Sequence, residues 1–95
     1  MTAQPPDRPV AARCDDAYLN VTLADGRVLR APLWWYPRLL AASADQRAAI
    51  EFSPLGLHWP AIDEDISVVS ILRGWKAPTA KPAPATRRAT WPAAD

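Results

Sequence analysis

The sequence predicts an α+β fold, in which a small antiparallel sheet, made of an N-terminal hairpin plus a further strand, packs with short helices. Residues 18–23 alternate apolar and polar side chains before Asp25-Gly26, a pattern typical of a hairpin. Residues 37–74 carry helix start and stop signals around two brief strand-like segments. With 95 residues, the chain has room for a single domain.

The hairpin is the first predicted element. Apolar side chains fall at every second position of residues 18–23, so one face of this strand is expected to be buried. Asp25-Gly26 favours the positive backbone angles of a tight turn. Residues 28–31 form the return strand, and Pro32 ends it because proline has no amide hydrogen to give to the sheet.

Two short helices are predicted next. Pro37 suits the first position of a helix through Ala42, because the amide hydrogen that proline lacks has no partner there. Ser43 with Gln46 three residues later has the form of a capping box. This pair predicts a second helix over residues 45–50.

The last part of the domain allows two interpretations. Residues 51–53 and 57–59 resemble short strands. The apolar positions at 62, 66, 69 and 72 share one helical face, and Gly74 is placed to end such a helix. The alternative is a strand over 66–72, because this segment is rich in β-branched residues. The helix is favoured.

The two ends of the chain differ from the middle in composition. Residues 1–14 combine prolines with small residues and show no periodicity, which predicts a flexible lead-in. The compact domain is therefore expected to span residues 15–74. Residues 75–95 form a proline- and alanine-rich basic tail that is predicted to be disordered and to serve at most as an auxiliary arm.

Composition and charge argue against several classes of function. A net charge of +1 and four dispersed tail cations are too weak a footprint for direct nucleic-acid binding. A single cysteine and a single histidine give no zinc-ligand spacing, so neither metal nor cofactor is predicted. No apolar stretch approaches the ~20 residues that span a bilayer, and no signal peptide is evident. The expected compartment is the cytoplasm.

One aromatic cluster has the composition of a binding surface. Adjacent aromatic side chains cannot all enter a small core, so at least one is expected at the surface. Tryptophan, tyrosine and arginine are also the residue types of binding hot spots. The predicted partner-binding residues are Trp34, Trp35, Tyr36 and Arg38. The alternative is that they form a purely structural aromatic corner.

A secondary candidate site combines His58 and Trp59 with Asp63, Glu64 and Asp65. Paired carboxylates near an imidazole can exchange protons, and carboxylates with a further oxygen ligand can hold a hard cation. Consecutive helical residues point in different directions, however, so a capping or solvated role is favoured. No glycine-flanked nucleophile is present, and no catalytic residue is assigned.

The chain resembles a bacterial family, the domain of unknown function 2442. The resemblance rests on Val21-Thr22-Leu23-Ala24-Asp25-Gly26-Arg27, Pro32-Leu33-Trp34-Trp35-Tyr36-Pro37-Arg38-Leu39, Ala44-Asp45-Gln46-Arg47, Gly56-Leu57-His58-Trp59-Pro60-Ala61-Ile62-Asp63-Glu64-Asp65-Ile66 and Leu72-Arg73-Gly74. It implies a compact α+β domain, either alone or joined to a helix-turn-helix module. Some members are encoded beside a second small domain, in arrangements resembling toxin-antitoxin pairs. No catalytic residues are carried over from this family.

These observations predict a non-catalytic protein-interaction module, an antitoxin-like partner of another small protein. A proline-alanine tail stands where fused members carry a DNA-binding module, which argues against operator recognition. Two alternatives remain open. One is a small enzyme or metal-dependent module that uses His58 and the Asp63-Glu64-Asp65 cluster. The other is a homo-oligomeric structural protein that associates with itself.

Overall fold

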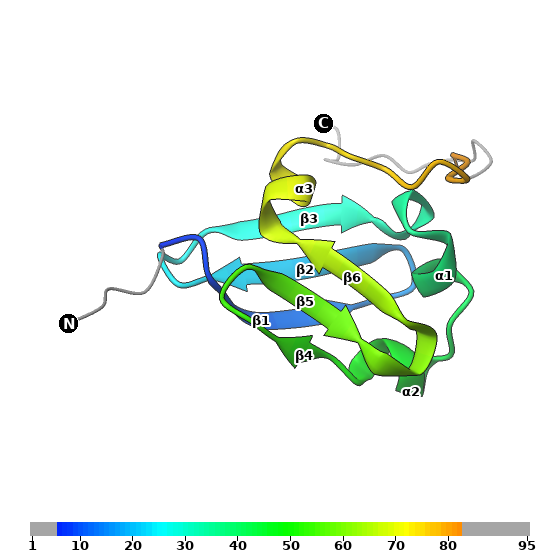
Figure 1. Ribbon diagram of the computed structural model, residues 1–95, viewed down its shortest axis with the longest axis horizontal. Helices are drawn as coiled ribbons and strands as arrows, with labels where there is room; N and C mark the ends of the chain where they lie inside the picture. Colours follow the sequence, from blue (N-terminus) through cyan, green and yellow to red (C-terminus); the bar gives the residue numbers. More distant parts are fainter. Residues whose placement is uncertain (1–5, 83–95) are drawn as a thin grey trace.

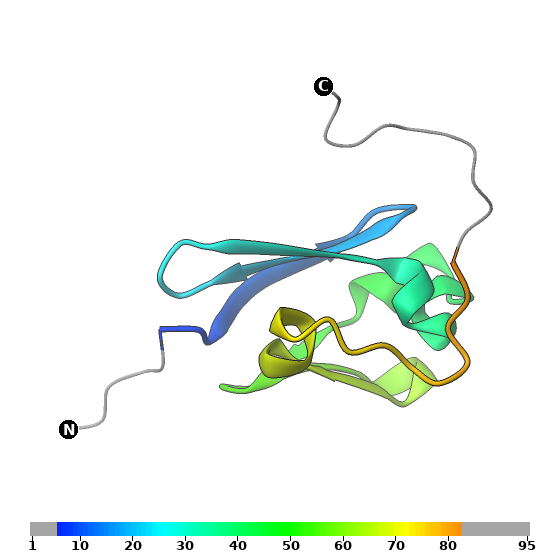
Figure 2. The same cartoon turned by 90° about the horizontal axis from the view of Figure 1, so that it is seen from above.

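Two three-stranded antiparallel sheets form the two layers of the fold, which confirms the predicted α+β class (Figure 1). The computed structural model describes residues 6–82. Seen from above, the sheets lie one over the other, with α1 and α2 at one end (Figure 2). The elements are β1 (Pro9–Cys14), β2 (Tyr18–Leu23), β3 (Val28–Pro32), η1 (Leu33–Trp35), α1 (Pro37–Leu40), α2 (Ala44–Ala48), β4 (Glu51–Phe52), β5 (Gly56–Trp59), η2 (Pro60–Ile62), β6 (Glu64–Ser67) and α3 (Val68–Leu72).

The predicted hairpin is present as β2 and β3, with β2 at the centre of the first sheet. Inward-facing side chains of β2 are completely or almost completely buried, as the alternating pattern predicts. Gly26 has a φ of 95°, which places it in the left-handed region that the hairpin turn requires. The local sequence pattern therefore decides both the register and the turn.

The predicted flexible lead-in over residues 1–14 is wrong for residues 9–14, which form β1. This strand pairs along its length with β2, from Pro9 opposite Leu23 to Cys14 opposite Leu19. A register irregularity between Pro9 and Ala11 accommodates the proline at the sheet edge. The order of β1 comes from hydrogen bonds to β2, which the weak local pattern of this segment does not reveal.

Short helices connect the two sheets. The capping box at α2 is confirmed, because the Ser43 hydroxyl accepts the Gln46 N–H and the Gln46 side chain accepts the Ser43 N–H. The Trp59 indole N–H donates to the Arg47 carbonyl at 3.0 Å and ties β5 to α2. Within residues 6–82, none of the helices has the length and apolar character needed to cross a membrane.

The segment that was predicted as a helix over residues 62–72 is divided into a strand and a helix. β6 pairs with β5 in the second sheet, and α3 starts only after Ser67. Asp63, at a φ of 54°, turns the chain into the strand, and the Ser67 hydroxyl accepts the Ser70 N–H to begin the helix. The helix prediction is therefore correct for residues 68–72 and wrong for 64–67, where pairing with β5 overrides the helical periodicity. The alternative of a strand over 66–72 is correct only for residues 66 and 67, because most of the β-branched residues that favoured it lie in α3.

The core fills the space between the two sheets. Its largest fully buried side chain is that of Trp59, from the central strand of the second sheet. Both sheets contribute further core residues, as do η1, α1 and α3. The buried hydrophobic residues are Leu19, Val21, Leu23, Ala31, Leu33, Tyr36, Leu39, Leu57, Trp59, Ile66, Val68 and Ile71.

The chain remains attached to the domain beyond the predicted boundary at Gly74. Trp75 donates its N–H to the Ser70 carbonyl at 3.0 Å, and Ala77 donates to the Trp35 carbonyl at 3.1 Å. The domain thus extends through Ala77, whereas residues 83–95 of the predicted tail lie outside the described residues.

Candidate functional site

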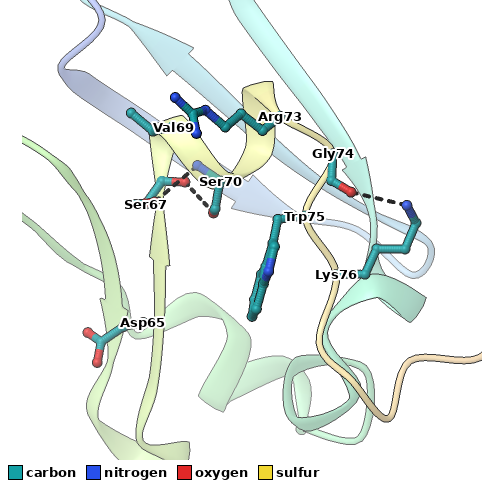
Figure 3. A pocket seen from close by; sticks show the side chains of 8 residues that line it. All are labelled: Asp65, Ser67, Val69, Ser70, Arg73, Gly74, Trp75 and Lys76. Carbon is teal, nitrogen blue, oxygen red and sulfur yellow. Dashed lines mark hydrogen bonds between the residues drawn. The ribbon is translucent and has the colours of Figure 1, made fainter.

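A groove with a volume of about 830 Å³ lies beside β6 (Figure 3). We call it the β6 groove. One wall is the edge of β6, and the opposite wall is α3 with the segment that follows it. Its lining residues are Asp65, Ser67, Val69, Ser70, Arg73, Gly74, Trp75 and Lys76.

The end of α3 positions Trp75 in this groove. Gly74, with a φ of 72°, donates its N–H to the Ile71 carbonyl, and Trp75 donates to the Ser70 carbonyl. This pair of bonds is a Schellman cap, whose left-handed residue is usually glycine. The cap turns the chain sharply, so the indole of Trp75 stands beside β6 and 58% of the residue stays exposed (Figure 3).

The groove-facing edge of β6 is unpaired, because β6 is the last strand of its sheet and no strand of residues 6–82 pairs with its outer side. Along an antiparallel strand, the backbone N–H and C=O groups of one residue point toward a given neighbouring strand, and those of the next residue point away from it. Val68 donates its N–H to the Leu55 carbonyl, just beyond the paired residues of β5 and β6. The backbone groups of Ile66, two residues earlier, therefore also point toward β5. The backbone groups of Asp65 and Ser67 therefore point into the groove.

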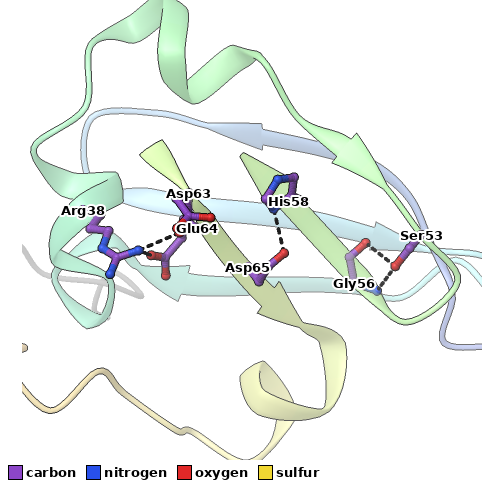
Figure 4. Close-up of polar contacts among 7 residues, drawn as sticks. All are labelled: Arg38, Ser53, Gly56, His58, Asp63, Glu64 and Asp65. Atoms are coloured by element: carbon purple, nitrogen blue, oxygen red, sulfur yellow. Dashed lines mark hydrogen bonds and ion pairs between the residues drawn. The ribbon is translucent and has the colours of Figure 1, made fainter. Parts of the chain in front are cut away.

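The charges around the groove are mostly positive. Arg73 is exposed, and the hydrogen bonds and ion pairs among residues 6–82 leave its guanidinium without a partner. The Lys76 ammonium donates to the Gly74 carbonyl at 3.1 Å and sits 4.6 Å from the centre of the Trp35 ring. The Asp65 carboxylate is turned toward His58, 2.7 Å from Nδ1 of the imidazole (Figure 4). An anionic ligand group thus meets a favourable environment here.

The predicted aromatic surface is divided between core and surface. Tyr36 is only 2% exposed and belongs to the core. Trp35 is half-buried and contacts both neighbouring rings edge-on, with centroids 6.4 Å from Trp34 and 6.2 Å from Tyr36. Trp34 lines a separate pocket of about 270 Å³ together with Tyr18 and Leu40.

Arg38 connects the two candidate sites that the sequence treats as separate. Its guanidinium donates to the Asp63 carbonyl oxygen at 2.6 Å and lies 3.9 Å from the Glu64 carboxylate (Figure 4). The two segments are 25 residues apart, and no local sequence signal indicates this contact. Arg38 therefore holds the turn that leads into β6, although its side chain is 62% exposed.

The secondary site does not converge on one point. His58 pairs with Asp65 on the outer face of the second sheet, whereas Glu64 lies near Arg38 and Trp59 is fully buried. Asp63 occupies the left-handed turn before β6. Within the part of the chain that the structure describes, no group of three histidine, cysteine or acidic side chains is arranged to hold a metal. The acidic cluster is thus spread over two faces.

Burial shifts the pKa of three side chains. Desolvation raises the pKa of Glu64, an effect that Arg38 opposes and that the neighbouring Asp65 and Asp63 reinforce. Desolvation also raises the pKa of Tyr36 to about 12 and that of Cys14 to about 11. The Cys14 thiol consequently stays protonated near neutral pH, which makes it a poor nucleophile.

Sequence reasoning missed the main residues of the β6 groove, Val69, Arg73 and Trp75, as parts of one site. It assigned Trp75 to the tail, although a large aromatic residue directly after a helix-ending glycine was a usable signal. Exposure of Val69 at 49% depends on how α3 packs, which the sequence pattern does not specify.

The fold and the groove at its edge define a small two-layer α+β domain. The chain belongs to the family described as "Protein of unknown function (DUF2442)", whose model matches residues 9–77. The match includes β1 and reaches Ala77, in agreement with the domain limits of the structure.

A solved structure is similar to the whole domain. It is the crystal structure of a protein of unknown function from Rhodospirillum rubrum, 32% identical in sequence, with a TM-score of 0.66. The similarity covers 77% of this chain and 93% of that one. A search of curated proteins finds no match. These comparisons establish the family and the fold, and neither name describes a function.

Proposed function

We propose that this protein is an interaction module that holds another protein in the β6 groove. The observation that carries the proposal is the exposed indole of Trp75, placed by the cap of α3 beside the unpaired edge of β6. An exposed tryptophan in a concave site supplies a large apolar area together with one hydrogen-bond donor, which suits a binding hot spot.

The dimensions and composition of the groove support this use. Its volume of about 830 Å³ and its open shape give room for the side chains of a partner protein. Val69 is 49% exposed and adds a second apolar side chain to the groove. Arg73 adds a charged group at the rim. Burial of the two apolar side chains by a partner is the main source of affinity.

The resemblance to members encoded beside a second small domain supports an antitoxin-like role. In this proposal the bound molecule is another small protein, and the module contributes recognition rather than catalysis. Of the residues in the enzyme alternative, His58 pairs with Asp65, whereas Glu64 lies near Arg38 and Asp63 occupies the turn before β6, so interaction is favoured over catalysis. The predicted surface at Trp34 is kept as a comparison, since its pocket is distinct from the β6 groove.

The test compares tagged full-length protein with the Trp75→Ala and Trp34→Ala variants. Each is used to capture partners from native lysate, and each protein identified by mass spectrometry is purified and titrated by calorimetry. We expect Trp75→Ala to weaken binding by more than about 1 kcal/mol, roughly fivefold in Kd, because it removes the apolar anchor. Trp34→Ala serves as the matched control and should retain affinity.

Two results would count against the proposal. If Trp75→Ala binds the partner as tightly as the unmodified protein does, the partner does not bind at Trp75. If only Trp34→Ala loses affinity, the partner binds at the pocket lined by Trp34 instead. Light scattering on the same samples measures whether the protein is a monomer or a dimer. A dimer that Trp75→Ala converts to monomer makes the partner a second copy of the chain.

A further inference from the structure

We infer that the partner enters the β6 groove as an extended peptide that adds a fourth strand to the second sheet. The inference rests on the proposed function, because it uses the same groove and specifies how the partner lies in it. It also assigns the backbone of β6, rather than side chains alone, as the main recognition element.

The outer edge of β6 has unpaired backbone groups that an added strand can bond. Asp65 presents both its N–H and its C=O to the groove, and Ser67 presents its N–H. The Ser67 carbonyl already accepts the Ser70 hydroxyl at 2.7 Å, so strand addition is favoured toward the Asp65 end. Unpaired donors and acceptors on a sheet edge are a template for an incoming strand, whose backbone forms the missing hydrogen bonds.

Side chains of the added strand alternate between two surroundings. One set faces α3, where Val69 and Trp75 offer an apolar surface (Figure 3). The other set faces the solvent side of the sheet, where His58 and Asp65 lie (Figure 4). The groove therefore selects a peptide with apolar residues at every second position, since the side-chain period of a strand is two.

Charge determines which polar residues the peptide carries. Arg73 is exposed without an ionic partner among residues 6–82, whereas the Asp65 carboxylate is already paired with His58. The positive charges of Arg73 and Lys76 beside the groove attract acidic side chains of the peptide, and these side chains lie on the solvent side of the added strand, opposite the apolar set. We therefore assign to the partner an extended segment that combines apolar and acidic residues.

A second copy of the chain fits this edge less well. Two antiparallel β6 strands would bring their own acidic residues, Glu64 and Asp65, close to one another across the interface. Like charges on directly paired strands are destabilising.

Amide hydrogen exchange tests the inference directly. The probe is an acetylated and amidated peptide of about seven residues, long enough for a typical strand, with alternating valine and glutamate. It is added to the isotope-labelled full-length protein. We expect the N–H groups of Asp65 and Ser67 to exchange at least about tenfold more slowly with the peptide bound, because they become hydrogen-bonded. The N–H of Asn20, inside the first sheet, serves as an internal control.

Backbone methylation of the peptide tests the edge pairing itself. Two isomers are compared, each with N-methyl groups on one of the two alternating sets of residues. Methyl groups on the set that faces β6 block strand addition, whereas those on the other set point away from it. One isomer should bind as the parent peptide does and the other should not. Equal binding of both isomers overturns the inference.

A charge reversal tests the assignment of acidic residues. Arg73→Glu should weaken binding of the valine-glutamate peptide by several-fold and favour the valine-lysine counterpart, because the rim charge is inverted. Arg13→Glu, on the exposed side of β1, is the matched control and should leave both affinities unchanged. Unchanged peptide preference in Arg73→Glu contradicts the acidic assignment.

The remaining outcomes separate the binding mode from the proposed function. If Trp75→Ala loses the captured partner while neither peptide nor partner protects Asp65 and Ser67, the interaction function holds and strand addition fails. If Trp75→Ala retains the partner, the proposed function itself fails. Absence of binding by the valine-glutamate peptide at millimolar concentration also overturns the inference.

Discussion

Arg38 donates a hydrogen bond to the carbonyl oxygen of Asp63 at 2.6 Å, across 25 residues of chain. Asp63 has a φ of 54° and is the only non-glycine residue with positive φ among residues 6–82. The contact therefore stabilises an uncommon backbone conformation at the start of β6. It joins α1, which follows the aromatic cluster, to the strand whose edge forms the candidate site.

Replacement of Arg38 by alanine should destabilise the domain by about 1 kcal/mol. Hydrogen bonds to charged groups contribute roughly 1.5–3 kcal/mol, and solvent exposure of this arginine reduces that contribution. Urea unfolding followed by circular dichroism measures the change, with Arg13→Ala as the exposed control. Equal stability of the two variants would show that the turn at Asp63 does not depend on this bond.

Gly56→Ala should be far more damaging than Gly26→Ala. A Cβ atom at Gly56 would overlap the Ile66 carbonyl oxygen and lie 2.8 Å from the Cα of Ser67, so β5 and β6 would have to separate. We expect a loss of about 2–4 kcal/mol, typical of overpacking against backbone.

At Gly26 a Cβ atom meets nothing within 4 Å, and only the positive φ opposes it. Its cost should be about 1–2 kcal/mol. Thermal unfolding of both variants, side by side, decides the order. A reversed order would mean that β5 and β6 adjust more easily than the hairpin turn.

The stability of the Glu64→Gln variant, compared with that of the unmodified protein, should increase as the pH rises. The folded-state pKa of Glu64 lies above the usual value of 4.5, chiefly because burial disfavours the charged form. The protonated form is therefore favoured in the folded state. Its stabilising effect is complete below the unfolded-state pKa and is lost as the pH rises through the folded-state pKa.

Denaturant unfolding of both proteins at several pH values between about 4 and 7 tests this prediction. The difference in unfolding free energy should move in favour of Glu64→Gln as the pH increases. Glu51→Gln, which changes an exposed carboxyl of β4 in the same sheet, is the control. If the unfolding free energies of Glu64→Gln and the unmodified protein change with pH in the same way, the pKa of Glu64 is not raised in the folded state.

Local signals account for the parts of the fold that the sequence predicts correctly. The alternation in β2, the turn at Gly26 and the capping box of Ser43 each depend on residues within a few positions of one another. The cap at Gly74 is of the same kind. In each case the backbone conformation is decided by side chains and dihedral preferences inside one segment.

Long-range pairing accounts for the errors. β1 begins with a proline and contains small residues, and it becomes a strand only because β2 provides its hydrogen bonds. β6 has a helical apolar period, yet pairing with β5 overrides it. Neither partner strand can be identified from the segment itself.

In the candidate site, too, local signals are predicted correctly and long-range packing is not. Composition correctly indicates that the aromatic cluster cannot be wholly buried, but it does not show that Tyr36 enters the core and Trp34 does not. Trp75, outside the predicted domain, becomes part of the main groove through the cap at Gly74. Which aromatic residue is exposed depends on the packing of several elements at once.

The amino-acid sequence by itself determined the α+β class, the hairpin, the helix caps and the family of this protein. Only the tertiary structure decided that β1 and β6 are strands, that Arg38 reaches Asp63, and that Trp75 stands beside an open sheet edge. The physical reason is the range of the interactions involved. Caps and turns act within a few residues, whereas strand pairing and groove formation require segments that only the folded chain brings together.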